Sequence, residues 1–109
     1  MGNRRHGISF ADRVYKLCRK IPKGRISTYK LVGKKMGRRG QIYRAVGVAL
    51  KKNPYAPKVP CHRVVASDGS LGGYSAKGGI KTKIKLLKKE GIQVKNNKII
   101  DFEKKLFRF

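Results

Sequence analysis

Hydrophobic residues recur every three or four positions in three stretches of the chain, with lysines and arginines between them. This spacing predicts amphipathic helices over Phe10–Ile21, Gln41–Lys52 and Gly79–Glu90. Ser9 can cap the first helix, and a Pro-Lys-Gly turn ends it. Cys18 lies on the apolar stripe of that helix, so a core role is favoured over a reactive one. A shorter helix is predicted over Tyr29–Met36.

The helix over Gln41–Lys52 follows closely on the shorter one. Its expected buried face consists of Ile42, Ala45, Val46, Ala49 and Leu50, and its other face of Tyr43, Arg44, Lys51 and Lys52. Two short helices joined by a glycine-containing turn at 37–40, the second one basic, outline a helix-turn-helix. The alternative is an ordinary helical hairpin with a solvated basic face.

The remaining apolar runs are short and predict a small β component. Extended segments are expected at Ile26–Thr28 and Val64–Ala66, with a turn at Ser67–Ser70 before Leu71 and a hairpin around Asn96 and Asn97. The helix over Gly79–Glu90 should bury Ile80, Ile84 and Leu87 and expose its lysines. The chain ends at 1–7 and 104–109 are expected to be mobile, unless Leu106, Phe107 and Phe109 dock onto the core. We expect one mainly α domain over 1–109.

The charge of the chain predicts a polyanionic partner. The sequence holds 29 Lys plus Arg against 5 Asp plus Glu, a formal net charge of +24. Nucleic acid is the first candidate and an anionic membrane face the second. The sequence has neither an apolar stretch of about 18 residues nor a signal-peptide pattern, which favours a cytoplasmic protein. Two cysteines and two histidines lack disulfide or zinc spacing, so neither metal nor cofactor is expected.

The segment Pro60–Val65 places a potential nucleophile beside a potential base. Proline stiffens the chain ahead of Cys61, whose other interpretation is a small buried hydrophobe. In an extended segment the side chains of Cys61 and His62 point to opposite faces, so a bridging water or a sharp turn is needed to connect them. Glu90 is a candidate to orient His62, although these residues alone favour a surface ion pair among lysines.

These residues resemble the DNA-binding, active-site domain of O6-alkylguanine-DNA alkyltransferases. The resemblance covers about residues 10–92, in order and with nearly the expected gaps. Its segments are Val14–Leu17, Ile21–Tyr29, Arg44–Gly47, Asn53–Pro54, Pro60–Val65, Ser67–Gly69, Gly72–Ser75 and Leu86–Gly91.

The resemblance implies a helix-turn-helix (winged-helix-like) domain that acts once on double-stranded DNA containing O6-alkylguanine. Cys61 would accept the alkyl group, His62 would deprotonate it through a water, and Glu90 would orient His62. The implied catalytic residues are Cys61, His62, Glu90, Asn53, which braces the site, and Tyr29, which helps rotate the nucleotide. The implied DNA contacts are Thr28, Tyr29, Tyr43, Arg44, which fills the vacated stack, Gly47 and Lys51. The implied pocket consists of Pro60, Val64, Tyr74 and Ser75.

Three features depart from the family pattern. Almost nothing precedes Phe10, whereas family members usually carry another domain there. Tyr43 stands where the family tends to have a small residue. The loop 75–79 is a little longer than is usual in the family. We expect a monomer. One alternative is a non-enzymatic alkyltransferase-like protein that binds the lesion and signals to other repair proteins, but Cys61 argues against it. Another is a general basic chromatin or RNA-binding protein, in which Cys61 and His62 would be idle.

Overall fold

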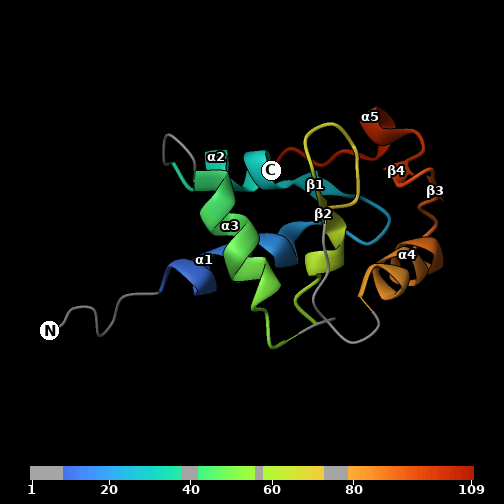
Figure 1. Ribbon diagram of the computed structural model, residues 1–109. Helices are drawn as coiled ribbons and strands as arrows, with labels where there is room; N and C mark the ends of the chain where they lie inside the picture. Colours follow the sequence, from blue (N-terminus) through green and yellow to red (C-terminus); the bar gives the residue numbers. More distant parts are fainter. Residues whose placement is uncertain (1–8, 38–41, 56–57, 73–78) are drawn as a thin grey trace, which may run out of the picture.

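The computed structural model describes residues 9–37, 42–55, 58–72 and 79–109. Four helices match the prediction to within one residue at either end, so the mainly α fold is confirmed. The short helix α5 was not predicted. In chain order the elements are α1 (Phe10–Lys20), β1 (Ser27–Thr28), α2 (Tyr29–Lys35), α3 (Ile42–Lys51), the 3₁₀ helix η1 (Cys61–Arg63), β2 (Val64–Val65), α4 (Gly79–Lys89), β3 (Val94–Lys95), β4 (Lys98–Ile99) and α5 (Phe102–Lys105) (Figure 1).

Side-chain caps define where two of the helices begin. The Ser9 hydroxyl accepts a hydrogen bond from the Asp12 amide at 3.1 Å, and the Thr28 hydroxyl accepts one from the Leu31 amide at 3.0 Å. Each cap satisfies an amide that has no partner within its own helix. Helix α2 therefore begins directly after β1, and Tyr29 is its first residue.

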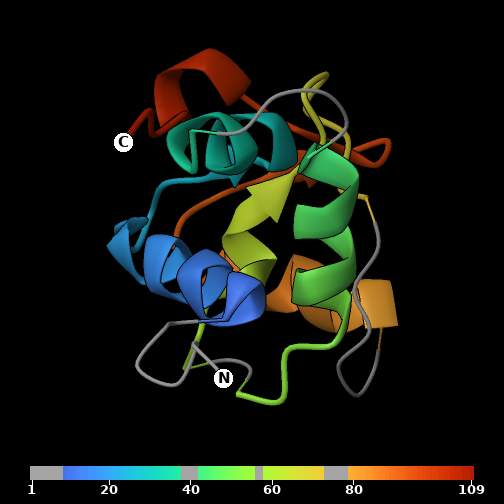
Figure 2. The same cartoon turned by 90° about the vertical axis from the view of Figure 1, so that its left-hand side faces the viewer.

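A two-stranded parallel sheet lies between two hydrophobic cores. Ser27 pairs with Val64 and Thr28 with Val65. Because side chains alternate along a strand, Val64 packs into the core made with α1, α2 and α3, while Val65 packs into the core made with α4 and Leu71. Figures 1 and 2 show η1 and β2 in the middle of the molecule, with α1 and α3 on one side and α4 on the other. Cys61 is thus held between two packed halves.

The C-terminal segment runs beside β1. Leu106 forms a parallel bridge with Ile26, the Phe107 amide donates to the Ile26 carbonyl at 2.7 Å, and the Ser27 hydroxyl donates to the Phe107 carbonyl at 2.9 Å. The docking of Leu106 and Phe107 is therefore confirmed, and the alternative of a loose end at 104–109 is wrong, because backbone pairing fixes it. The predicted hairpin at Asn96 and Asn97 is formed by β3 and β4.

Two predictions of burial are wrong. Ala45 is exposed on α3, because Val46, Ala49 and Leu50 already fill the surface that this helix turns towards α1. Lys83 is fully buried on α4, where all lysines were expected to be exposed. Ile42, Ile80 and Ile84 are half-buried. Among the residues described, no helix is long and apolar enough to cross a membrane.

Candidate active site on the corner before β2

Pro60 forms the predicted stiff corner. Its backbone angles, φ −80° and ψ 65°, are those of an inverse γ-turn. The Cys61 amide donates the hydrogen bond of this turn to the Val59 carbonyl at 2.8 Å. The proline ring favours this φ. The chain then turns again, because Cys61–Arg63 is a 3₁₀ helix. The expectation of an extended segment at Cys61 and His62 is therefore wrong, and the sharp turn that was its alternative is confirmed.

Asn53 ties this corner to the end of α3. Its side-chain amide donates to the Val59 carbonyl at 3.0 Å, the same carbonyl that accepts from the Cys61 amide. Its side-chain oxygen accepts from the Tyr55 amide at 2.9 Å. One side chain thus links the loop after α3 to the backbone of Cys61, which is the contact expected of a brace.

Cys61 and His62 are buried, at 8% and 2% exposure, and diverge from one another. Successive residues of a 3₁₀ helix project about 120° apart, since three residues complete a turn. His62 Nε2 lies 3.0 Å from Glu90 Oε2, whereas buried Nδ1 has no hydrogen-bond partner among the residues described. The carboxylate favours the proton on Nε2, which leaves Nδ1 as the nitrogen that can accept one.

Glu90 is shared by His62 and Arg63. The Arg63 guanidinium binds both carboxylate oxygens, Nε to Oε1 at 2.9 Å and Nη2 to Oε2 at 2.7 Å, and Nη1 donates to the Ile21 carbonyl at 2.9 Å. Glu90 is only 10% exposed in this pair. The interpretation of Glu90 as an ordinary surface ion pair is therefore wrong, because its partners are two neighbours of Cys61.

Burial controls the protonation states around the site. Burial lowers the pKa of His62, and this effect outweighs the hydrogen bond to Glu90, which raises the pKa. The imidazole is therefore mainly neutral at pH 7. Burial alone would raise the pKa of Glu90, but hydrogen bonds from Arg63 and His62 lower it and keep the carboxylate ionised. Burial raises the pKa of Cys18 to about 12, which agrees with its predicted core role.

Tyr29 and Gly72 form another wall of the site. Tyr29 is half-buried, and burial followed by the charge of Cys61 raises the pKa of its hydroxyl to about 12. Gly72 has a φ of +69°, and a Cβ there would lie 2.9 Å from the Tyr29 hydroxyl. Pro60 and Val64, two predicted pocket residues, are buried. Tyr74 and Ser75 lie outside the described residues.

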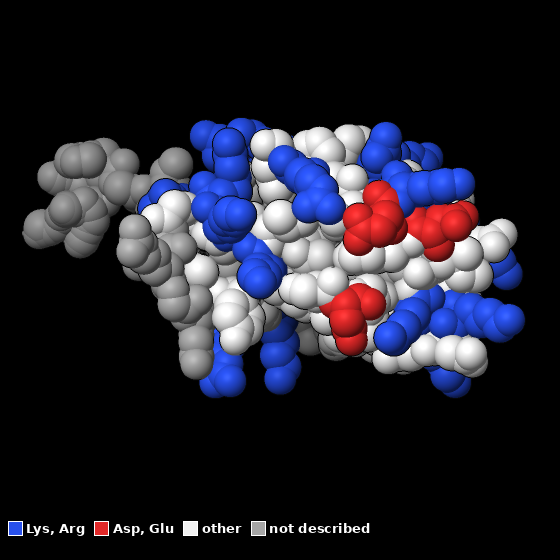
Figure 3. Space-filling model, turned by 90° about the horizontal axis from the view of Figure 1, so that it is seen from above, with Lys and Arg blue, Asp and Glu red and all other residues white. Residues whose placement is uncertain are grey.

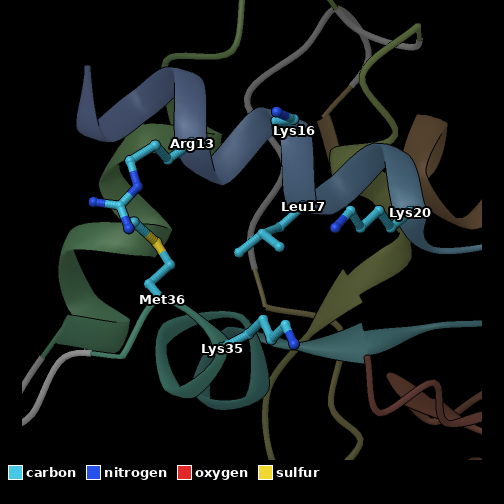
Figure 4. A pocket seen from close by; sticks show the side chains of 6 residues that line it. All are labelled: Arg13, Lys16, Leu17, Lys20, Lys35 and Met36. Atoms are coloured by element: carbon cyan, nitrogen blue, oxygen red, sulfur yellow. The ribbon is translucent and has the colours of Figure 1, made fainter. Parts of the chain in front are cut away.

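The predicted DNA contacts lie mainly on α3. Tyr43, Arg44 and Lys51 are exposed and Gly47 is half-buried, whereas Thr28 is 3% exposed and uses its hydroxyl to cap α2. Lysine and arginine side chains spread over the surface in Figure 3, while the few acidic ones lie in one half of the view. A cationic hollow lies between α1 and α2. Arg13, Lys16, Lys20 and Lys35 surround it, with Leu17 and Met36 between them (Figure 4).

Known proteins match the chain over this same region. The family model of the 6-O-methylguanine DNA methyltransferase DNA-binding domain matches residues 9–92, which is most of the chain and includes every element from α1 to α4. The chain belongs to this methyltransferase family. The motif around Cys61 and the helix pair α2–α3 are therefore those of the family's DNA-binding domain.

Individual members of the methyltransferase family are similar in sequence and structure. The methylated-DNA–protein-cysteine methyltransferase of Metallosphaera sedula is 51% identical over 87 residues, 80% of this chain and 52% of that protein. Mycobacterium tuberculosis OGT in complex with DNA superposes with a TM-score of 0.70 at 43% identity, over 77% of this chain and 50% of the other. The chain spans about half the length of the curated relatives it matches.

A shorter protein matches over nearly its whole length. S. pombe Atl1, in complex with damaged DNA containing O6-carboxymethylguanine, superposes with a TM-score of 0.77 at 26% identity. The match covers 92% of this chain and 95% of Atl1. The methyltransferase-family domain thus matches relatives of two lengths.

Two site residues were not predicted from sequence. Arg63 follows His62 directly, and its position next to a predicted base was the signal that could have indicated it. Lys83 had no such signal, because it is one of many lysines on an otherwise basic helix. Only the packing of α4 against β2 identifies it.

Proposed function

We propose that the protein repairs DNA by transferring the alkyl group of an O6-alkylguanine to Cys61, once per molecule. The observation that carries the proposal is the arrangement of His62 at the Cys61 corner. Its Nε2 is held by Glu90, and its buried Nδ1 is available to accept a proton. A neutral imidazole oriented by a carboxylate is suited to deprotonate a nearby thiol.

The proposed reaction needs no cofactor. The Cys61 thiol passes its proton to Nδ1 of His62 through a water, and the thiolate attacks the alkyl carbon. The carbon–sulfur bond forms as the carbon–oxygen bond breaks, and the electron pair leaves with O6 of guanine. The Tyr29 hydroxyl keeps its proton at neutral pH and can donate a hydrogen bond to the departing base. A thioether is a poor leaving group, so Cys61 is not regenerated.

The burial of Cys61 requires that the damaged nucleotide rotate out of the duplex. O6 lies inside the double helix, and a thiol that is 8% exposed cannot reach it there. In this proposal α3 lies against DNA, Arg44 fills the vacated stack, and Tyr29 at the start of α2 favours the rotation. The surrounding cations hold the phosphates, so binding should weaken steeply with salt. We propose a cytoplasmic location, in association with the DNA of the cell.

A lesion-binding protein without transfer is the second candidate. The match to S. pombe Atl1 over nearly its whole length favours it. Cys61 favours transfer, because a pure sensor has no use for a nucleophile beside an oriented imidazole.

The deciding experiment incubates the protein with a duplex containing O6-methylguanine and measures intact mass and a peptide map. We expect one methyl group on Cys61. Cys18→Ser is the matched control and should be methylated as well, whereas Cys61→Ser should not. An unmodified protein that still prefers the lesion would establish the sensor. Loss of any lesion preference would indicate a general nucleic-acid binder.

A further inference from the structure

A continuous strip of cations runs along the outer side of α1 and α2. The hollow between these helices is lined by cations from both, with Leu17 and Met36 between them (Figure 4). Lys35 lines this hollow and also a neighbouring one, which it shares with Lys34 and with Arg108 of the C-terminal segment. The two hollows therefore form one surface. We call it the outer strip, and its cations, all exposed, are Arg13, Lys16, Lys20, Lys34, Lys35 and Arg108.

The charges of the outer strip are almost uncompensated. Its one ion pair within the described part of the chain joins Arg108 to Glu103 at 3.3 Å, and both side chains are more than half exposed. On α1, Arg13, Lys16 and Lys20 follow one another at intervals of three and four residues. Side chains at these intervals are neighbours on a helix, so like charges repel each other and destabilise it. A polyanion bound to the outer strip would remove this repulsion.

The shape and chemistry of the hollow between α1 and α2 suit a DNA backbone. Lys20 of α1 and Lys35 of α2 extend into the opening from its two walls, near the apolar side chain of Leu17 (Figure 4). Ammonium groups bind phosphates without reading the base sequence. Leu17 and Met36 offer apolar surface to the sugars that alternate with those phosphates.

The outer strip faces away from α3, the helix that the proposed function places on DNA. A Cβ on Gly33 would lie 2.8 Å from Cγ2 of Ile42 and 3.4 Å from the Tyr43 amide nitrogen, so this side of α2 packs against α3. Successive residues of an α-helix are about 100° apart, which places Lys35 about 160° around α2 from Gly33. A straight duplex bound at Arg44 therefore does not reach Lys35, because the width of α2, about 10 Å, lies between them.

We propose that the outer strip binds the backbone of a second segment of duplex DNA while α3 lies on the first. The inference rests on the DNA binding of the proposed function and goes beyond alkyl transfer, because it concerns how the protein passes between stretches of DNA in search of a lesion. A protein that holds two segments can bind the second before it leaves the first. Its dissociation from one duplex then becomes faster as the concentration of another duplex rises.

The test uses duplexes without a lesion, so alkyl transfer does not enter the measurement. Protein bound to a fluorescently labelled duplex is mixed with increasing amounts of unlabelled duplex, and fluorescence anisotropy gives the dissociation rate. For the wild type we expect a rate that rises with the concentration of unlabelled duplex. In Lys20→Gln/Lys35→Gln this dependence should be at least about tenfold weaker, because each phosphate contact contributes about eightfold to affinity at 0.1 M salt relative to molar salt.

Lys81→Gln/Lys85→Gln is the matched control, because both lysines are exposed on α4 and the change in net charge is the same. It should keep the wild-type dependence on unlabelled duplex. Lys20→Arg/Lys35→Arg, which retains the charges, should keep it as well. Circular dichroism checks folding. If Lys20→Gln/Lys35→Gln does not fold, Lys35→Gln is measured in its place and should weaken the dependence at least about threefold, since it removes one contact.

Three results would overturn the proposal. The first is a wild-type dissociation rate that does not depend on unlabelled duplex, or equal behaviour of Lys20→Gln/Lys35→Gln and its control. The second is weaker binding of the labelled duplex with unchanged dependence, which would show that one duplex bends around both faces. The third is binding to phosphatidylserine vesicles that only this variant loses, with unchanged transfer between duplexes, which would assign the strip to a membrane surface. Failure of the wild type to methylate Cys61 would instead overturn the proposed function and leave this test intact.

Discussion

Replacing Glu90 with glutamine should destabilise the fold far more than the same change at an exposed ion pair. Glu90 is 10% exposed, and its carboxylate accepts two hydrogen bonds from Arg63 and contacts His62. Glutamine keeps the shape but removes the charge, and its amide nitrogen cannot accept. Arg63, 16% exposed, would then be a nearly buried cation without its counter-charge.

The structure sets the magnitude of this effect. Removing one partner of a buried ion pair costs about 3–5 kcal/mol. Glu90 follows the C-terminal end of α4, where a negative charge is unfavourable, and removing it there offsets about 0.3–1 kcal/mol. The expected net loss in the free energy of unfolding is therefore about 2–5 kcal/mol. Urea lowers the free energy of unfolding of small domains by about 2 kcal/mol per molar, so the midpoint should fall by roughly 1–2.5 M.

Glu103→Gln is the matched control in urea unfolding followed by circular dichroism. Its pair with Arg108 is exposed, at 78% and 63%, so its loss should cost about 0.5 kcal/mol or less. The pKa of Glu90 is lowered in the folded state, so its contribution is present above the ordinary pKa of 4.5 and disappears as the pH falls. The gap between wild type and Glu90→Gln should therefore narrow below pH 4.5. Equal losses for the two variants, or a gap independent of pH, would refute the reasoning.

Three further predictions concern His62, Gly72 and Thr28. The imidazole resonances of His62 should titrate with a midpoint below pH 6.5, because burial lowers the pKa of this side chain. In Glu90→Gln the midpoint should be lower still, because the carboxylate that raises the pKa is gone. A midpoint above pH 6.5 in the wild type would contradict the assigned environment. Gly72→Ala should lose about 1–2 kcal/mol in thermal or urea unfolding, because φ is +69° and the new Cβ meets the Tyr29 hydroxyl. Gly47→Ala, where a Cβ meets nothing within 4 Å, should instead gain about 0.5–1 kcal/mol. Thr28→Ala should lose about 1 kcal/mol through the missing cap of α2, and an unchanged stability would show that the cap is dispensable.

The helices could be predicted because the signals that define them are local. Ser9 caps α1 through an amide three residues away, and Gly37 and Gly91 follow α2 and α4 with positive φ. Burial was less predictable, because it depends on which side chains of a helix fill its contact with the neighbouring elements. Ala45 belongs to the apolar pattern of α3, but Val46 and Leu50 fill the contact, and Ala45 is left in the solvent beside Arg44.

The site residues that belong to a local motif could be predicted from the sequence. Those whose partners come from distant elements could not. The Pro60 corner and the candidate base His62 could be predicted from neighbouring residues of one motif, and the family resemblance indicated Glu90. The bond between Glu90 and Arg63 joins residues 27 positions apart. Lys83 acquires its partners only when α4 packs beside β2 and Leu71, so nothing in its immediate sequence distinguishes it from Lys85.

The placement of buried ionisable groups supports a chemical role for this corner over a purely structural one. Among the residues described, the buried polar or charged residues are Ser27, Thr28, His62 and Lys83. Ser27 and Thr28 complete backbone hydrogen bonding and need no further explanation. His62 directly follows Cys61 in η1, and Lys83 binds the carbonyl of Val64, which follows η1. Apolar residues in the places of these two side chains would often stabilise a small domain at least as well. A fold that buries two ionisable side chains at one corner gives up stability there, which agrees with the chemical role proposed for Cys61.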